Sequence, residues 1–332
     1  MPPAVNASSP RASCSSSFTD KCGHQPPGHK PLERTSMKIG ISRPFADPGV
    51  PINDVDMGEI GRMAEQIGFD WLTSGHHTVR PLREEIKGPH THGVPFYQDP
   101  LIGAARATAM TTRLEVSTGV LIMPMKHPVD VAKQVACIDA YSNGRFMLGL
   151  GTGGASRIEI EASGGSFERR WAYTMESVAV MKGLWTQDSF AFDGEFFQFP
   201  EVQMYPRPAR KPHTPILLGG YSDAVLERVG KHCQGWVPAY AGTRLLSLSE
   251  TDMTGPDHVR QGRIKIMAHA QEAGRDIAHF EIGVILAPGD DALDLRNVYE
   301  DAGADRLAFS LPHIASVEDA RIALENIAAN VL

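Results

Sequence analysis

The sequence predicts an α/β fold and, within that class, a (β/α)8 TIM barrel in which eight parallel strands are each followed by a helix. Two observations support this prediction. From Met37 onward, short apolar segments rich in β-branched residues alternate with segments whose apolar residues recur at helical spacing. At 114–154 a strand, a crossover helix and a second strand follow one another, which makes the two strands parallel.

The same segment shows both patterns most clearly. Residues 114–123 are β-branched and almost free of charge, as expected of a strand that is covered on both faces. Residues 127–141 place apolar side chains on one helical stripe, and Asn143-Gly144 ends the helix. A second strand, 145–154, ends in a group of glycines. Parallel sheets bind ligands at the carboxyl ends of their strands, so we expect a phosphate-bearing cofactor there.

The other elements follow in chain order. Strands are predicted at 38–42, 69–73, 114–123, 145–154, 216–220, 235–238, 280–286 and 305–310. Helices are predicted at 53–67, 99–111, 127–141, 170–185, 222–231, 257–273, 292–302 and 317–331. A small hairpin at 189–199, turning at Asp193-Gly194, is predicted as an insertion outside the barrel. The long loop 74–98 and the segment 155–169 are candidate lids over the site.

Composition and charge limit the functional classes. Residues 1–36 are mostly Pro, Ser, Gly and small polar residues, which predicts a disordered tail and leaves 37–332 as one barrel domain. We expect Met37 to be the natural start. The net charge of −7 argues against binding of nucleic acid, and no apolar run is long enough to cross a membrane. Four scattered cysteines without a CxxC pair fit a reducing compartment, which predicts a cytoplasmic location.

Two groups of glycines follow adjacent strands of the predicted barrel. The first includes Gly151, Thr152 and Gly153, and a GxGxG pattern of this kind is equally compatible with a simple tight turn. The second, Gly219-Gly220-Tyr221-Ser222, directly precedes a helix, with Ser222 at the expected N-cap position. Backbone N–H groups at a helix N-terminus suit a phosphate, so both groups together predict a phosphate site.

His76 follows the second predicted strand, on the face where barrel enzymes place their catalytic groups. A histidine there can transfer protons or form a hydrogen bond with a polar heterocycle, and a loop residue without chemistry is the alternative. His77 is predicted to be structural. A metal site built from His76, His77, His90 and His92 would indicate a metallo-hydrolase barrel, but the last two lie in a Pro/Gly-rich loop, so we predict no metal ligand.

Several motifs together resemble those of the luciferase-like monooxygenase superfamily. They are Gly119-Val-Leu-Ile-Met-Pro-Met-Lys-His-Pro-Val, Lys133-Gln134, Asp139, Gly144-Arg-Phe, Gly149-Leu-Gly-Thr-Gly, Glu159, Gly164, Phe167, Arg170, Glu176, Leu184-Trp185, Pro206-Arg-Pro, Lys211-Pro-His-Thr-Pro-Ile and Gly219-Gly220. The resemblance covers nearly all of 37–332 and is closest to the branch that depends on the deazaflavin coenzyme F420. Two positions depart from the pattern: Gly75 replaces a residue that is usually acidic, and Gly154 replaces a frequent Trp.

The resemblance implies a barrel that holds a flavin or deazaflavin ring at its carboxyl-end mouth. A non-proline cis peptide bond at Gly119-Val120 would support the ring, and His76 matches the active-site histidine of the family. The phosphate would lie at Gly219, Gly220, Tyr221 and Ser222, with Gly151, Thr152 and Gly153 nearby.

The implied function is that of an F420- or FMN-dependent oxidoreductase, which carries out hydride transfer or monooxygenation of a small organic substrate. F420 is the predicted cofactor and FMN the alternative, because four basic residues offer partners for the acidic F420 tail: Arg157, Arg169, Arg170 and Lys231. A reductase or dehydrogenase that supplies reduced cofactor and a second copy of the chain in a homodimer are the candidate partners. A flavin-binding protein without catalysis is the other alternative, and Gly75 keeps it open.

Overall fold

The computed structural model describes residues 37–42, 55–79, 98–154, 157–240, 255–276, 279–286, 292–312 and 314–332. The chain divides into two compact units, Met1–Thr35 and Ser36–Leu332, and only the second contains described residues. The predicted tail at 1–36 therefore lies outside the described part of the chain.

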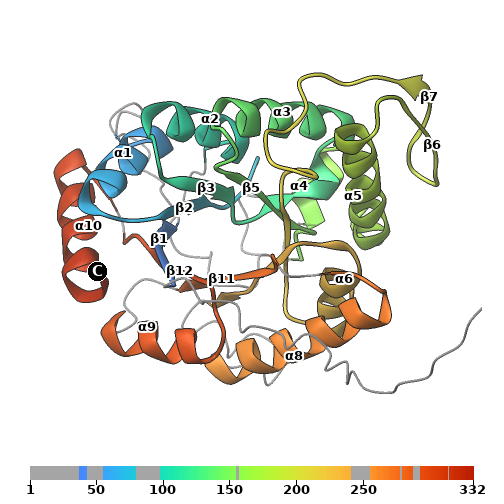
Figure 1. Ribbon diagram of the computed structural model, residues 1–332. Coiled ribbons are helices and arrows are strands. Elements are labelled where there is room, and N and C mark those ends of the chain that lie inside the picture. Colours follow the sequence, from blue (N-terminus) through green and yellow to red (C-terminus); the bar gives the residue numbers. More distant parts are fainter. Residues whose placement is uncertain are drawn as a thin grey trace, which may run out of the picture. The chain divides into compact units, whose positions relative to one another are not determined.

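The strands of this unit close into a barrel with eight parallel strand positions, which confirms the predicted fold (Figure 1). β9 pairs with both β8 and β11, and this double pairing joins the two ends of the sheet. Two of these eight positions are each occupied by two short consecutive strands, β3 with β4 and β9 with β10. The strands are β1 Lys38–Ser42, β2 Trp71–Ser74, β3 Glu115–Thr118, β4 Leu121–Ile122, β5 Phe146–Gly151, β8 Ile216–Gly219, β9 Gly235–Val237, β10 Ala239–Tyr240, β11 Glu281–Leu286 and β12 Arg306–Ser310.

Helices surround this barrel, and a main hydrophobic core fills the layer between them and the strands (Figure 1). They are α1 Met57–Ile67, α2 Pro100–Met110, α3 Pro128–Tyr141, α4 Arg157–Ala162, α5 Arg170–Thr186, α6 Asp223–His232, α8 Pro256–Glu272, α9 Ala292–Asp301 and α10 Val317–Val331, with a 3-10 turn η2 at Met123–Met125. A smaller cluster lies inside the barrel and consists of Trp71, Met147, Leu217, Val237, Ile285 and Ala308. The interior is therefore packed with side chains, as in other barrels of this kind.

The continuous strand predicted at 114–123 is wrong in detail. The structure divides it into β3 and β4, and the peptide bond between Gly119 and Val120 in the gap is cis. The cis bond that the resemblance implied is thus present. The first helix begins at Met57 rather than at residue 53, because the buried Asp56 side chain caps it by accepting a hydrogen bond from the Glu59 N–H at 2.9 Å.

The predicted hairpin forms, with β6 at Phe190–Asp193 and β7 at Gln198–Val202, and its two strands make a separate sheet. Its turn is wider than the predicted Asp193-Gly194 pair, because Asp193 is still paired with Gln198 and residues 194–197 form the loop. Glu176 of α5 causes the widening. Its carboxylate accepts the backbone N–H groups of residues 195, 196 and 197 at 2.8–3.0 Å.

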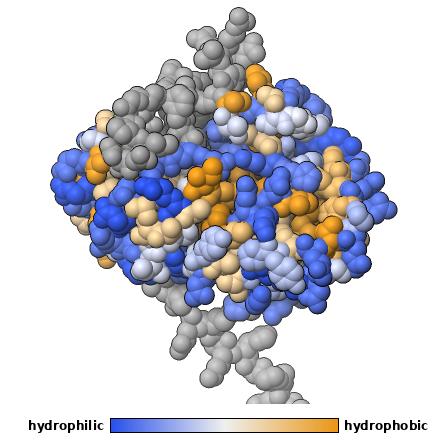
Figure 2. Space-filling view, turned by 90° about the horizontal axis from the view of Figure 1, so that it is seen from above, coloured by the Kyte–Doolittle hydropathy of each residue, from blue (hydrophilic) through white to orange (hydrophobic). Residues whose placement is uncertain are grey.

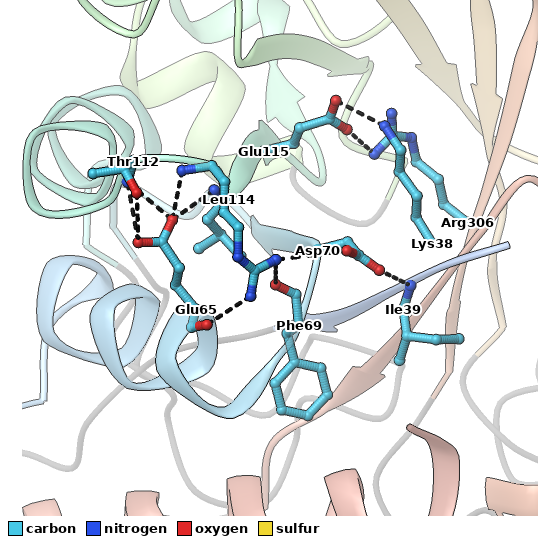
Figure 3. Close-up of polar contacts among 10 residues, drawn as sticks. Lys38, Ile39, Glu65, Phe69, Asp70, Thr112, Leu114, Glu115 and Arg306 are labelled. Carbon is cyan, nitrogen blue, oxygen red and sulfur yellow. Dashed lines mark hydrogen bonds and ion pairs between the residues drawn. The ribbon is translucent and has the colours of Figure 1, made fainter. Parts of the chain in front are cut away.

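Charged residues begin four of the strands at the amino-terminal end of the barrel, and Figure 3 shows three of them, Lys38, Glu115 and Arg306. Arg306, which is 1% exposed, pairs with Glu115 and with Glu281, and Lys38 lies 2.8 Å from Glu115. Burial opposes the charge of the Glu115 carboxylate, but Arg306 and Lys38 outweigh it and hold the pKa of Glu115 below its usual value. The opening of the barrel is therefore at the opposite, carboxyl end.

Figure 2 looks onto the wall that α2 and α3 form at the top of Figure 1. Hydrophobic patches interrupt a mainly hydrophilic surface there. Two large side chains of these helices are strongly exposed, Ile102 of α2 and Tyr141 of α3. Among the described residues, no helix is both long enough and apolar enough to span a membrane.

Candidate active site

Two of the predicted site residues, Gly151 and Gly219, pack against the side chain of Val120 at the carboxyl ends of β5 and β8. A Cβ atom at Gly151 of β5 would come closer than 3.0 Å to one methyl group of Val120, and a Cβ atom at Gly219 of β8 would lie 3.0 Å from the other. Real Cβ atoms essentially never approach closer than 3.0 Å. The two glycines thus make room for Val120, which rests on the ends of two neighbouring strands, and Gly119 packs just as closely against Thr73.

The loop between β8 and α6 contains the residues predicted to bind a phosphate. Gly220 has φ +123°, a conformation that L side chains rarely adopt, and Trp236 of β9 holds its carbonyl oxygen with an indole N–H hydrogen bond of 2.8 Å. Ser222 occupies the N-cap position as predicted, but its exposed side chain makes no capping hydrogen bond. The half-buried Tyr221 packs against the hydrophobic core.

A larger residue at Gly220 would be strained for two reasons that have nothing to do with a phosphate. Its φ is unfavourable, and its Cβ would lie 3.0 Å from Val225 of α6. Trp236, in turn, is packed from the outside by α8, where Gly262 leaves space for the indole ring and His258 contacts it edge-on at 5.3 Å. The β8–α6 loop is therefore held by its own packing before any ligand binds.

The loop after β5 contributes the second group of predicted residues. Thr152 is buried and Gly153 has φ +67°, a turn conformation that favours glycine. Gly151 itself pairs in register with Ile122 of β4. This pairing matters for the site because the Ile122 N–H is also the group that contacts His76.

His76 is buried, and both of its ring nitrogens have hydrogen-bonding partners. Nδ1 accepts the N–H of Ile122 at 3.1 Å, and Nε2 lies 3.1 Å from Thr78 Oγ1. Burial, helped by the nearby charge of Lys126, lowers the pKa of His76 to about 4. The ring is therefore neutral near pH 7, and because Nδ1 is an acceptor, its proton is on Nε2. That arrangement makes His76 a hydrogen-bond donor in the mouth of the barrel.

His77 has a partner that the sequence did not predict. Its Nδ1 lies 2.8 Å from Oε2 of Glu159, which is on α4 and whose side chain is 4% exposed, whereas that of His77 is 23% exposed. The alternation in Arg157-Ile-Glu-Ile-Glu gave no hint of a helix, yet α4 forms and turns Glu159 inward. The next residue, Ile160, packs against Ile122 and Met125, so α4 covers the segment that holds His76.

The basic residues predicted to bind an acidic cofactor tail already have partners. Arg157 pairs with Glu161 and Glu168 at 2.8 and 2.5 Å, Arg169 with Glu195, and Lys231 with Glu227 at 2.5 Å. Arg170 donates to the carbonyl oxygen of Phe167 at 2.6 Å and stacks on its ring at 3.9 Å.

The metal alternative rests partly on histidines that the structure does not describe. His90 and His92 lie outside the described residues. Within the described ranges, no three His, Cys, Asp or Glu side chains are grouped so that they could hold a metal ion.

Comparison with known proteins identifies the family of this fold. Residues 37–304 match the luciferase-like monooxygenase family. The chain belongs to that family. An uncharacterised protein of Mycobacterium tuberculosis is 30% identical over 238 residues, which are 69% of this chain and 76% of the relative. The pyrimidine monooxygenase RutA of Allorhizobium ampelinum is 27% identical over 79% of this chain and 67% of its own length.

Solved structures agree in fold with this luciferase-like chain. An F420-dependent secondary alcohol dehydrogenase, in complex with an F420-acetone adduct, has a TM-score of 0.68 at 16% identity and covers 88% of this chain and 98% of its own. Other structures with the same fold include a further F420-dependent reductase and a monooxygenase in complex with FMN. The structural neighbours thus use both cofactors.

Proposed function

We propose that this luciferase-like protein is an oxidoreductase that binds a flavin or deazaflavin cofactor in the carboxyl-end mouth of its barrel. The observation that supports the proposal most strongly is the packing of Val120 on Gly151 and Gly219, here called the Val120 cradle. A Cβ atom at either glycine would take the space that the Val120 methyl groups occupy. The cradle lies at the end of β8, next to the loop that leads to the N-terminus of α6. A flat ring beside the Val120 side chain and a phosphate at the helix N-terminus fit these two features.

The cofactor, when bound, supplies hydride transfer or the activation of oxygen, and the protein supplies binding, orientation and exclusion of water. In this proposal Trp236 holds the phosphate loop through the Gly220 carbonyl, and the neutral His76 exchanges its Nε2 hydrogen bond with Thr78 for one to a polar group of ring or substrate. The acidic first-turn residue Asp223 would repel a phosphate, but Lys265 lies 2.6 Å from it and offsets that charge.

Between the two cofactors, one observation favours FMN over the F420 that the sequence predicted. F420 continues beyond its phosphate into an acidic tail, which needs basic partners. Three of the four basic residues predicted for that role are ion-paired with glutamates: Arg157, Arg169 and Lys231. FMN ends at its phosphate and needs none of them. F420 nevertheless stays in the test below, because partly exposed ion pairs are weak and a tail carboxylate can compete for them.

The test is a titration of the protein with FMN and with F420, each at low and high salt, followed by absorbance and fluorescence. Binding of either cofactor supports the proposal, and binding of neither refutes it. A tight F420 complex that weakens with salt would select F420, because its tail carries additional charge. Turnover of a reduced cofactor then separates an enzyme from a flavin-binding protein without catalysis.

A pair of tryptophan variants tests the phosphate loop. Trp236→Phe removes the N–H bond to the Gly220 carbonyl at 2.8 Å and should weaken cofactor binding by about tenfold, the value of one hydrogen bond. Trp185→Phe is the matched control, because Trp185 is equally buried and its indole N–H also binds a backbone carbonyl, that of Ala132 at 2.9 Å. Equal losses of affinity in the two variants would exclude Trp236 from the cofactor site.

A further inference from the structure

Four neighbouring strands place hydroxyl side chains at one level of the barrel. These strands follow one another in the sheet as β12, β1, β2 and β3 (Figure 1). Ser42 of β1 pairs in register with Ser310 and with Thr73, and Thr73 pairs with Ser117. All four residues are buried, and together they are called the hydroxyl row below.

The side chains of the hydroxyl row point toward the barrel axis. Successive side chains of a strand alternate between its two faces. Trp71, two residues before Thr73, belongs to the cluster inside the barrel. The residues directly before Ser42 and Ser310 belong instead to the core between strands and helices. Since Ser42 and Ser310 are the last residues of β1 and β12, the hydroxyl row faces inward at the carboxyl end of the barrel.

The inner face of the other strands is apolar near this end, as far as the structure describes it. Gly151 and Gly219 have no side chains there, and Val237 and Ile285 are aliphatic. The Val120 cradle lies on the same side. The mouth of the barrel is therefore polar along β12, β1, β2 and β3 and apolar along β5, β8, β9 and β11.

The hydrogen bonds within the hydroxyl row leave one proton without an acceptor. The indole N–H of Trp71 donates to Ser117 Oγ at 2.9 Å. Ser117 in turn donates its hydroxyl proton to Thr73 Oγ1, also at 2.9 Å. For the proton of Thr73 itself, the described part of the chain offers no acceptor. Thr73 can therefore still donate a hydrogen bond.

Ser42 is the member of the row that contributes least to the fold. It is 1% exposed, and its hydroxyl makes no hydrogen bond with any described residue. Its neighbour Ser310 differs, because it donates to the carbonyl oxygen of Leu286 at 2.5 Å and keeps its lone pairs free. An unpaired buried hydroxyl costs free energy, so alanine would serve the fold at Ser42 at least as well. The hydroxyl of Ser42 is thus available to a ligand.

We propose that the hydroxyl row forms the substrate side of the site and binds an uncharged polar group, such as the amide of a small lactam. This inference rests on the proposed function. With the cofactor ring on the Val120 side of the mouth, the substrate lies against the ring from the side of β12, β1 and β2. Ser42 and Thr73 donate to its carbonyl oxygen, and the lone pairs of Ser310 accept its N–H.

The absence of charge in the hydroxyl row determines the class of substrate. A carboxylate or an ammonium group would lose its hydration there and find no counter-charge in the row, which makes its burial costly. An apolar substrate would leave the hydroxyls of Ser42 and Thr73 unpaired. A neutral group that both accepts and donates hydrogen bonds avoids both costs.

Two serines at neighbouring strand ends provide a matched pair of variants. Ser42→Ala removes a hydroxyl that faces into the barrel. Ser74→Ala removes a hydroxyl of β2 that is also buried and without a partner, but Ser74 shares the outward face of its strand with Leu72. Neither change breaks a hydrogen bond in the part of the chain that the structure describes. We therefore expect urea midpoints no lower than that of the wild type, and a lower midpoint in Ser42→Ala alone would contradict the inference.

Ligand binding is measured on the full-length protein loaded with whichever of FMN and F420 it binds, by saturation-transfer NMR of the ligand protons. The probes are γ-butyrolactam, which is a neutral amide, cyclopentane, which has the same ring size without polar atoms, and acetate, which is ionised. We expect the wild-type protein to prefer the lactam. Ser42→Ala should weaken lactam binding by about tenfold, the value of one hydrogen bond, and Ser74→Ala should not; cofactor affinity should be the same in all three proteins.

The outcomes separate this inference from the proposed function. Failure of the wild-type protein to bind either cofactor refutes both. Cofactor binding without a preference for the lactam, or with equal losses in Ser42→Ala and Ser74→Ala, refutes the role of the hydroxyl row and leaves the proposed function standing. A loss of lactam affinity in Ser42→Ala alone, with intact cofactor binding, supports the inference.

Discussion

The packing of Val120 on two strand-end glycines can be tested by adding one methyl group. Gly151→Ala places a Cβ closer than 3.0 Å to a methyl carbon of Val120, whereas an unstrained contact between carbon atoms is about 3.5–4.0 Å. Gly151 does not have a positive φ, so alanine is compatible with its backbone. Any destabilisation therefore reports this one contact.

The expected size follows from the geometry. Forcing an additional carbon into a packed site costs typically 1–3 kcal/mol, so we expect the free energy of unfolding to fall by about 2 kcal/mol. In a Val120→Ala background the offending methyl groups are absent, and the nearest remaining atom is the Val120 Cβ at 3.4 Å, an ordinary contact. There the same substitution should cost less than about 0.5 kcal/mol, which leaves a coupling energy of about 1.5 kcal/mol.

The assay is a double-mutant cycle measured by urea unfolding, with the midpoint interpreted only where the m-value is unchanged. Gly154→Ala is the control, because a Cβ at this glycine of the same loop meets nothing within 4 Å. If Gly151→Ala costs as much in the Val120→Ala background as in the wild type, Val120 does not rest on Gly151, and the cradle argument fails.

Three further predictions concern stability. Arg145→Met should lower the free energy of unfolding, measured in urea, by about 3 kcal/mol, because the guanidinium donates to the carbonyl oxygens of residues 108, 111, 114 and 142 at 2.8–3.1 Å. The control is Arg260→Met, which removes an exposed ion pair and should change the free energy of unfolding little. Burial alone would raise the pKa of Glu65, but hydrogen bonds from the backbone N–H groups of 112–114 outweigh it and lower that pKa (Figure 3). The stabilisation of the folded protein by the Glu65 carboxylate is therefore present above about pH 4.5 and is lost on acidification. Glu65→Gln should flatten this part of a curve of stability against pH. Burial lowers the pKa of His76 from 6.5 to about 4, so as the pH falls the unfolded state takes up the proton before the folded state does. The free energy of unfolding should therefore fall by up to about 3 kcal/mol between pH 6.5 and 4. His76→Gln should not show this loss in thermal unfolding.

The barrel could be predicted because its periodicity is local. The bounds predicted for the first strand and the last helix, 38–42 and 317–331, are those in the structure, since a run of apolar residues or a helical stripe identifies each element without knowledge of its neighbours. The division of 114–123 into two strands has no corresponding pattern in the sequence. A β-branched run reads the same whether or not it is interrupted, and only the family resemblance indicated the cis bond at Gly119-Val120.

Deviations arose where a distant side chain decides the local structure. The hairpin loop 194–197 is wide because Glu176, about twenty residues earlier, binds its N–H groups. In the site, His76 and His77 are adjacent in sequence, but their partners lie 46 and 82 positions away. Composition and spacing cannot predict different environments for two identical neighbours, because the difference comes entirely from those distant partners.

For the basic residue Lys231, in contrast, the sequence itself indicated the partner. Glu227 and Lys231 are four positions apart on the predicted helix 222–231, the spacing at which opposite charges meet. Arg157 and Glu161 have the same spacing, but in a segment for which no helix was predicted. A cation that has a carboxylate one turn away is already partly neutralised, so its presence near a binding site says little about an acidic ligand. The choice between F420 and FMN therefore needs the direct titration with each cofactor rather than a count of the surrounding arginines and lysines.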